Sequence, residues 1–185
     1  MRLYLVRHGQ TEFNVRKLWT GQMDIPLTEE GRQQAAAIRP KLEKIPFDRV
    51  YASDLSRAVE TQRTVLPEAE ARLTPLLREI DVGSIGGTSG NAEVLQTWDF
   101  TPYGGENAEM ILERVRAFLR MLEDDPAENV VAFAHSGVLT STLQAVLGVQ
   151  FDRDATVSRN CAVHVFEHSR GKWRLLAWNY EGVTE

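Results

Sequence analysis

The chain has 185 residues, of which 43% are hydrophobic and 25% charged, so it can form one domain, over residues 1–185, whose core needs no disulfide or metal support. Its net charge of −5 argues against a general attraction to nucleic acid or to an anionic membrane, and no segment approaches the roughly 20 apolar residues of a membrane span. The single cysteine, Cys161, excludes an internal disulfide. We therefore expect a soluble cytoplasmic protein.

The N-terminal segment is the first predicted strand. Leu3 to Val6 is a run of four apolar residues, which is typical of a buried strand. The run leads directly into Arg7, His8 and Gly9. We expect the end of this strand to deliver an arginine and a histidine into a crevice.

A loop and a helix follow. Residues 11–24 show no sustained periodicity, which predicts a loop over a pocket, where Asn14 and Thr20 can donate hydrogen bonds. Thr28 is a favourable N-cap, and two glutamates follow it, so a helix is predicted from there. Pro40 predicts a kink or an early end of that helix.

The same alternation continues in the middle of the chain. Residues 50–53 predict a second strand, and a helix follows at once, with Ser53 or Asp54 as its cap. This arrangement places Arg57 at a junction of strand and helix. Residues 71–74 predict a short third strand.

A glycine-rich segment separates these elements from the next helix. Residues 83–90 contain too many glycines for a regular element and predict a flexible lid. Beyond Gly104 and Gly105, apolar residues at helical spacing predict a helix that ends at residues 124–126. The residues that mark its buried face are Ile111, Val115, Phe118, Leu119 and Leu122.

The last third of the chain repeats the opening design. Residues 129–134 predict a strand that again ends in a histidine, His135, and a helix is predicted over residues 138–147. Residues 162–166 and 173–178 predict a hairpin that completes the sheet.

Strands that alternate with helices predict a three-layer α/β/α fold with a mostly parallel central sheet, in which ligands bind beyond the carboxyl ends of the strands. Three of these ends carry cationic or cationisable groups. They are Arg7 with His8, Arg57, and His135. Backbone amides at the adjoining helix N-termini also favour an anion. The sequence therefore predicts a site for a tetrahedral dianion such as phosphate.

A zinc site formed by the two histidines and Glu79 is the main chemical alternative. Guanidinium groups beside the histidines would repel a dication, whereas arginine grips an oxyanion through parallel hydrogen bonds. We therefore favour the anion. The same positive surroundings should keep His8 neutral, as a nucleophile requires.

Six short blocks of sequence contain these residues. The blocks are Arg7–Asn14, Asp24–Thr28, Ser53–Ala58, Leu77–Ile80, Gly104–Glu106 and His135–Gly137. In this order, and over nearly the whole chain, they resemble the histidine phosphatase superfamily, also called phosphoglycerate-mutase-like. Six blocks in register are far more specific than an Arg-His-Gly triplet alone.

The resemblance implies a metal-independent phosphomonoesterase without a cofactor, acting on a small phosphorylated metabolite and on neither nucleic acid nor membrane. His8 would be the nucleophile that forms a phosphohistidine, and Glu79 the general acid and then the general base. Arg7, Arg57 and His135 would complete the phosphate pocket. Further substrate contacts are expected from Asn14, Thr20, Gly21 and Ser136.

Two other functions compete with this one. A cofactor-dependent phosphoglycerate mutase would need a bisphosphate to prime its histidine, and the short chain between Glu79 and His135 favours the phosphatase. A non-catalytic phosphate-binding protein is disfavoured because the four principal residues are intact. The sequence leaves open which metabolite is the substrate and whether the chain forms a homodimer.

Several residues suit a structural role as well as a functional one. Glu79 could instead form a salt bridge with Arg78 or another arginine, and the aromatic residues Trp98, Phe100 and Tyr103 suit either a substrate pocket or the core. His164 and His168 are expected to be packing or solvated residues in the hairpin and its turn. The family commonly has an aromatic and an acidic residue where this chain has Ile85 and Gly86, and a serine in place of Asn107, so lid contacts cannot be transferred.

Overall fold

The computed structural model describes residues 1–89, 94, 97–150, 156 and 158–180. The strands are β1 (Arg2–Arg7), β2 (Arg49–Ala52), β3 (Arg72–Leu73), β4 (Asn129–Ala134), β5 (Val163–Ser169) and β6 (Lys172–Tyr180). The α-helices are α1 (Glu12–Val15), α2 (Glu29–Leu42), α3 (Ser56–Val65), α5 (Ala108–Glu123) and α6 (Ser136–Leu147). Short 3-10 helices span Pro75–Leu77, Gly83–Ile85 and Thr101–Tyr103.

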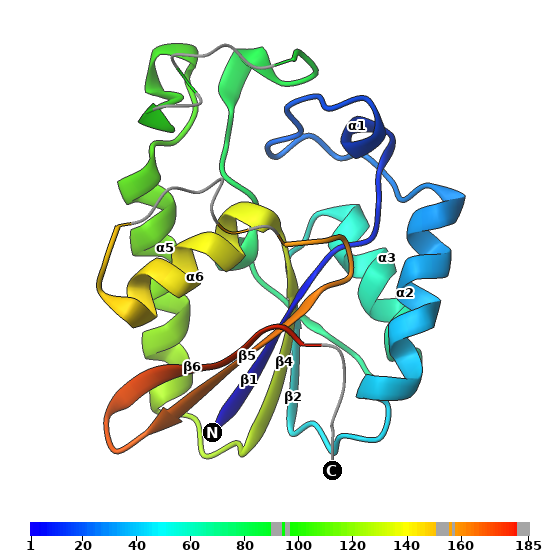
Figure 1. Ribbon diagram of the computed structural model, residues 1–185, viewed down its shortest axis with the longest axis vertical. Helices are drawn as coiled ribbons and strands as arrows, with labels where there is room; N and C mark the ends of the chain where they lie inside the picture. The colour runs from blue at the N-terminus through cyan, green and yellow to red at the C-terminus, as the bar shows by residue number, and fades with distance from the viewer. Residues whose placement is uncertain (90–93, 95–96, 151–155, 157, 181–185) are drawn as a thin grey trace.

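The strands form one sheet in the order β3-β2-β4-β1-β5-β6 (Figure 1). β1 pairs in parallel with β4, and β2 pairs in parallel with both β3 and β4. The predicted hairpin, β5 and β6, forms an antiparallel edge beside β1. The register sets Arg7 opposite Ala134, so β1 and β4 end at the same level. Residues that follow the two strands are therefore neighbours.

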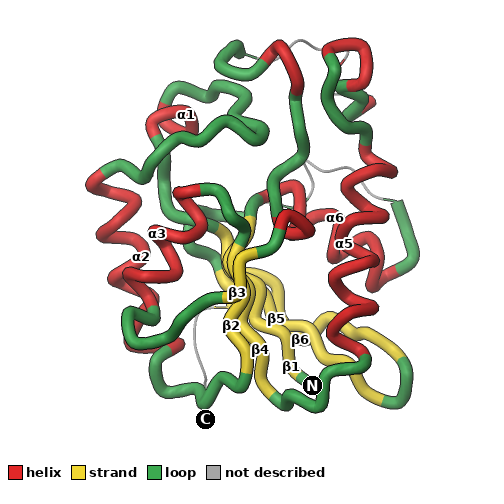
Figure 2. Tube along the Cα trace, turned by 180° about the vertical axis from the view of Figure 1, so that it is seen from behind, coloured by secondary structure: helices red, strands yellow, loops and turns green. Residues whose placement is uncertain are grey.

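Helices cover both faces of the sheet, which confirms the three-layer fold (Figures 1 and 2). α2 and α3 lie on one side, and α5 and α6 lie on the other. Side chains of β1 alternate between the two layers, as the pleat of a strand requires. Leu3 and Leu5 belong to the cluster under α5 and α6, whereas Tyr4 and Val6 belong to the cluster under α2 and α3.

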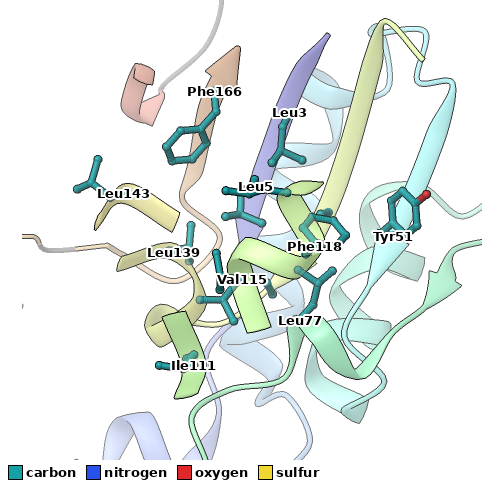
Figure 3. Packing of buried hydrophobic residues seen from close by; sticks show 14 of the residues in the cluster. Leu3, Leu5, Tyr51, Leu77, Ile111, Val115, Phe118, Leu139, Leu143 and Phe166 are labelled. Atoms are coloured by element: carbon teal, nitrogen blue, oxygen red, sulfur yellow. The ribbon is translucent and has the colours of Figure 1, made fainter. Parts of the chain in front are cut away.

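The core under α5 also holds the segment that carries Glu79 (Figure 3). Leu77 is fully buried in this cluster, and Ile80 is 2% exposed. Tyr51 and Phe118 meet edge to face, with ring centroids 5.5 Å apart. Truncating a buried leucine to alanine typically costs about 2 to 5 kcal/mol, so this packing fixes the backbone on both sides of Glu79.

The predicted cap of α3 is wrong. Neither Ser53 nor Asp54 caps this helix, which begins at Ser56. Asp24, from the loop ahead of α2, accepts the hydrogen bond from the Ser56 amide at 2.8 Å instead. The carboxylate of Asp54 is already bound by Arg78, at 2.6 Å. A residue distant in sequence therefore caps the helix, in place of the neighbouring residue that was predicted.

Three further features differ from the predictions. The segment predicted as a loop contains the short helix α1, in which Thr11 and Asn14 form a capping box. Pro40 does not end α2, which continues to Leu42. The side chain of Leu42 is fully buried, and this burial stabilises the last turn despite the hydrogen bond that proline cannot make. α6 begins at Ser136, two residues earlier than predicted.

The predicted lid is partly regular. Residues 83–85 form a 3-10 helix, which the glycine content did not suggest. The following residues pair with the loop after α1, because the Trp19 amide donates to Thr88 and the Gly87 amide donates to Trp19, each at 2.8 Å. Residue 90 lies outside the described residues, and the mobility of the segment stays a prediction.

The hairpin of β5 and β6 turns through two residues. Arg170 and Gly171 have φ values of 53° and 70°, as the common tight turn between antiparallel strands requires. His168 lies within β5 and not in the turn where it was predicted. Cys161 is buried, and burial raises the pKa of its thiol to about 12, which fits an ordinary core cysteine. Among the described residues, no helix is long and apolar enough to cross a membrane.

Candidate active site

The two histidines that end neighbouring strands lie together. His8 follows β1 and His135 follows β4, and the centroids of their rings are 5.1 Å apart. Their exposed fractions are 4% and 0%. The parallel register of the two strands therefore produces the pair that the sequence predicted.

Hydrogen bonds assign opposite tautomers to these rings. Nδ1 of His8 lies 2.6 Å from the carbonyl oxygen of Gly9, which can only accept, so Nδ1 carries the hydrogen and Nε2 keeps a lone pair. Nδ1 of His135 accepts from Nε of Arg57 at 3.2 Å, so the hydrogen of that ring is on Nε2. This Nε2 is buried and has no partner among the described residues. One ring therefore presents a lone pair on Nε2, and the other presents an N–H donor on Nε2.

Both rings are held neutral. Burial lowers the pKa of His8 well below its ordinary value of 6.5, and the charges of Arg57 and Arg7 act in the same direction. Burial and the charge of Arg57 likewise lower the pKa of His135 well below 6.5. This supports the expectation that His8 needs no base to become a nucleophile.

Arg57 is fully buried, and the chain around it fixes its guanidinium. Besides the bond to His135, Nη1 donates to the Met23 carbonyl and Nη2 to the Gly21 carbonyl, each at 2.8 Å. Burial lowers the pKa of Arg57 to about 10, and the charge of Glu79 opposes this shift. Three of its five N–H groups are occupied, so two can donate to an oxyanion. Gly21, whose carbonyl accepts one of these bonds, has a φ of 52°, in the left-handed region that favours glycine.

Arg7 supplies a second buried guanidinium. Its Nη1 donates to the carbonyl of Ser158, and its Nε is buried without a partner among the described residues. Burial lowers the pKa of Arg7, while the charge of Glu79 raises it. An oxyanion in the cavity would give these donors the partners that they lack.

The carboxylate of Glu79 lies at the N-terminus of α6. Its Oε1 accepts from the amide of Gly137 at 3.0 Å and from the amide of Ile80 at 2.9 Å. The helix dipole also favours a negative charge at this position. The alternative salt bridge with Arg78 is not formed, because that arginine pairs with Asp54.

Gly137 is the residue that gives Glu79 its place. A Cβ atom at position 137 would overlap Oε1 of Glu79. We predict that Gly137→Ala lowers kcat/KM for an alkyl phosphate about 100-fold, because a misplacement of the Glu79 carboxyl group by roughly 1 Å can cost that much. The measurement is a double-mutant cycle with Glu79→Gln. If Gly137 acts through Glu79, its substitution has little further effect in the Glu79→Gln background; a full additional loss there would contradict the assignment.

A partly buried ion pair behind Glu79 was not found from the sequence. Arg114, on α5, donates to the Arg78 carbonyl at 2.8 Å and to the Glu79 carbonyl at 3.2 Å, and it pairs with Glu106 at 2.7 Å. Glu106 also accepts from the amide of Asp81 at 2.9 Å. The pair thereby anchors both sides of the Glu79 backbone to α5. The family block at Gly104–Glu106 was the only signal for it in the sequence.

Most of the predicted residues line one cavity of about 210 Å³. Its lining includes Arg7, His8, Arg57 and Glu79 together with the predicted contacts Asn14, Thr20, Gly21 and Ser136. His135 does not line the cavity and is connected to it through Arg57 and the His8 ring. Three aromatic residues were expected in either the substrate pocket or the core. Trp98 lines the cavity, Phe100 is fully buried in the core, and Tyr103 packs against the core.

Asn14 is prepared as a donor. Its Oδ1 accepts from the amide of Thr11 at 3.0 Å and from Nδ2 of Asn160 at 3.3 Å, which leaves its own NH₂ group for a ligand. Asn160 also donates to the carbonyl of His8 at 3.0 Å. Sequence reasoning missed Asn160, because nothing in its local pattern connects it with His8. No group of three His, Cys, Asp or Glu side chains in the described part of the chain is arranged to hold a metal ion.

His164 lies behind this site, and its protonation contributes to the change of the free energy of unfolding with pH. Its Nδ1 accepts from the amide of Asn179 at 3.2 Å, and its Nε2 lies 3.0 Å from Oγ of Ser158. Burial lowers the pKa of His164 from 6.5 to about 3. Between these two pH values the unfolded chain binds a proton that the folded chain does not, so stability falls as the pH falls.

We predict that this histidine contributes a slope of about 1.4 kcal/mol per pH unit below pH 6.5. Urea unfolding at pH 7 and at pH 5 should therefore show a loss for the wild type about 2 kcal/mol larger than for His164→Gln. His8 and His135 remain in both proteins, so their contributions cancel in the comparison. Equal losses in the two proteins would show that His164 does not stay neutral.

A site of this composition, at the carboxyl edge of a parallel sheet, suits the transfer of a phosphoryl group, since fixed donors, a neutral imidazole and a carboxyl group line one cavity. The sequence comparison agrees. Residues 3–181 match the histidine phosphatase superfamily (branch 1), and the chain belongs to this family. It is therefore an enzyme of the histidine phosphatase type, as the resemblance implied.

The chain is similar to several characterised members. It is 35% identical over 161 residues to the adenosylcobalamin/alpha-ribazole phosphatase of Salmonella typhimurium, covering 80% of each chain. A mycobacterial glucosyl-3-phosphoglycerate phosphatase solved in complex with VO3 is 30% identical, with a TM-score of 0.85 over 96% of this chain and 98% of the other. The phosphoglycerate mutase structure from Thermus thermophilus is 31% identical, with a TM-score of 0.77 over 97% and 99%. These similarities confirm the predicted fold.

Proposed function

We propose that the protein is a metal-independent phosphomonoesterase that hydrolyses a small phosphorylated metabolite through a phosphohistidine on His8. The observation that carries the proposal is the pair of opposite tautomers. Nε2 of His8 has a lone pair for the phosphorus atom, while Nε2–H of His135 is a buried donor without a partner among the described residues. A pair of metal ligands would instead present two lone pairs to one point.

In the first step, Nε2 of His8 attacks phosphorus and the ester P–O bond breaks. Glu79 receives a proton from the incoming phosphate monoester monoanion and gives it to the leaving oxygen, so the product leaves as a neutral alcohol. Arg7 and Arg57, which line the cavity, donate to the transferring oxygens, and the buried Nε2–H of His135 is a further donor beside the His8 ring. Fixed donors in a site with little water stabilise the transition state most, because they need no reorganisation during the reaction.

In the second step, the Glu79 carboxylate takes a proton from water while the water oxygen attacks phosphorus. The P–N bond breaks, inorganic phosphate leaves, and the lone pair returns to Nε2 of His8. Glu79 passes this proton to the departing phosphate, so the cycle closes without a metal or a cofactor. A mutase would instead return the phosphoryl group to an organic acceptor.

The test measures p-nitrophenol and inorganic phosphate released from p-nitrophenyl phosphate with a chelator present. We expect equal amounts of both products, unchanged activity with chelator, and a phosphoenzyme that is stable in base and labile in acid, as a phosphoramidate is. Loss of activity on chelation would contradict the proposal. Transfer to added glycerate in place of phosphate release would favour the mutase.

A further inference from the structure

The cavity has a second part that the two chemical steps do not use. Its wall is formed by Leu18, Trp19, Val82 and Trp98, all of which line the same cavity as His8. The rings of Trp19 and Trp98 meet edge to face, with centroids 5.6 Å apart. Both tryptophans are partly exposed, whereas His8 and Val82 are buried, so the tryptophan rings lie nearer the mouth, where the leaving alcohol of a phosphomonoester must sit.

Trp98 is held in a costly backbone conformation. Its φ is 49°, in the left-handed region that residues other than glycine rarely adopt. Strain of this kind costs about 1 to 3 kcal/mol and gathers at ligand sites, because surrounding structure must enforce it. Packing of its ring against Phe100, with centroids 6.1 Å apart, helps to fix the side chain at the cavity wall.

Among the described residues, no cationic side chain lines the wall. Within the lining, the cationic side chains are Arg7 and Arg57, which belong to the phosphate pocket. In the sequence, no lysine, arginine or histidine occurs between Arg78 and Arg114, and both of these arginines pair with carboxylates. The nearest cations before the wall, Arg16 and Lys17, are exposed and do not line the cavity.

From this we infer that the substrate is a phosphomonoester of a neutral alcohol with a compact, planar apolar group, and that Trp19 and Trp98 bind that group. The inference rests on the proposed function. A second phosphate or a carboxylate on the substrate would be desolvated against apolar side chains without a counter-charge, which is costly. The cavity of about 210 Å³ is smaller than the roughly 300 to 1,000 Å³ of sites for drug-sized ligands, so a single ring fits best.

The experiment compares three alkyl phosphates with similar leaving oxygens: benzyl phosphate, glycerol 3-phosphate and 3-phosphoglycerate. Phosphate release by the full-length enzyme should give a kcat/KM at least 10-fold higher for benzyl phosphate than for 3-phosphoglycerate. Trp98→Leu should lower the value for benzyl phosphate about 10-fold and change that for glycerol 3-phosphate less than 3-fold. Trp173→Leu, on β6 and outside the cavity, is the matched control and should change neither.

A gain of function makes the test independent of any loss of folding. Leu18→Arg adds a cation to the wall and should raise kcat/KM for 3-phosphoglycerate about 10-fold relative to benzyl phosphate. If the wild type prefers 3-phosphoglycerate, or if Trp98→Leu lowers all three substrates equally, the inference is overturned while the phosphatase stands. If no substrate releases phosphate, the proposed function itself fails.

Discussion

His8→Ala should lower phosphate release at least about 10⁴-fold, the scale of loss seen when the nucleophile of a covalent mechanism is removed. The neighbouring histidine cannot replace it, because the lone pair of His135 Nδ1 is already bound to Arg57. The measurement is the steady-state rate on p-nitrophenyl phosphate, together with acid–base trapping of the phosphoenzyme. Both signals should vanish together.

Loss of the fold would produce the same result, so binding is the control. Arg7, Arg57 and the free donor of His135 remain in His8→Ala, and inorganic phosphate should still raise the melting temperature, as a ligand of the folded state does. His8→Ala also removes an imidazole beside the two arginines, which leaves more room for the bound phosphate. A variant that keeps more than about 1% of the wild-type rate would show that another group is phosphorylated.

The local sequence is enough to predict most of the fold. The apolar runs that became β1 and β4 are buried on both faces, and such runs have few other structures open to them in a chain of this size. The parallel arrangement then places His8 beside His135 without any further information. The carboxyl edge of a parallel sheet is in this sense predictable from the order of the elements.

The parts that sequence reasoning missed depend on contacts between distant segments. Asp24 caps α3 from 32 positions away, and Asn160 reaches the carbonyl of His8 across 152 positions. Arg114 holds the backbone of Glu79 from 35 positions away. Propensity and periodicity describe neighbours along the chain, so they cannot reveal such partners. The order of the elements predicted the site residues at strand ends, and the family resemblance predicted Glu79, but neither predicted supporting residues such as Asn160 and Arg114.

Glu79→Gln should separate the two chemical steps. The amide oxygen of glutamine can still accept from Gly137 and Ile80, so the side chain keeps its place while its proton is lost. For alkyl phosphates, whose leaving oxygen needs that proton, the loss should be about 10² to 10⁴-fold. p-Nitrophenolate is a good leaving group without a proton, so the first step on p-nitrophenyl phosphate should remain fast.

The second step still needs a base, and p-nitrophenyl phosphate should therefore phosphorylate the variant faster than water releases it. We expect rapid mixing to show a burst of p-nitrophenol close to one equivalent per enzyme, followed by a slow steady rate, with phosphohistidine accumulating. Glu113→Gln is the comparison, since it changes an exposed carboxylate on α5 that touches neither Glu79 nor a reacting atom, and it should give no burst. A Glu79→Gln variant that loses both steps equally, without a burst, would mean that Glu79 positions the site and does not transfer protons.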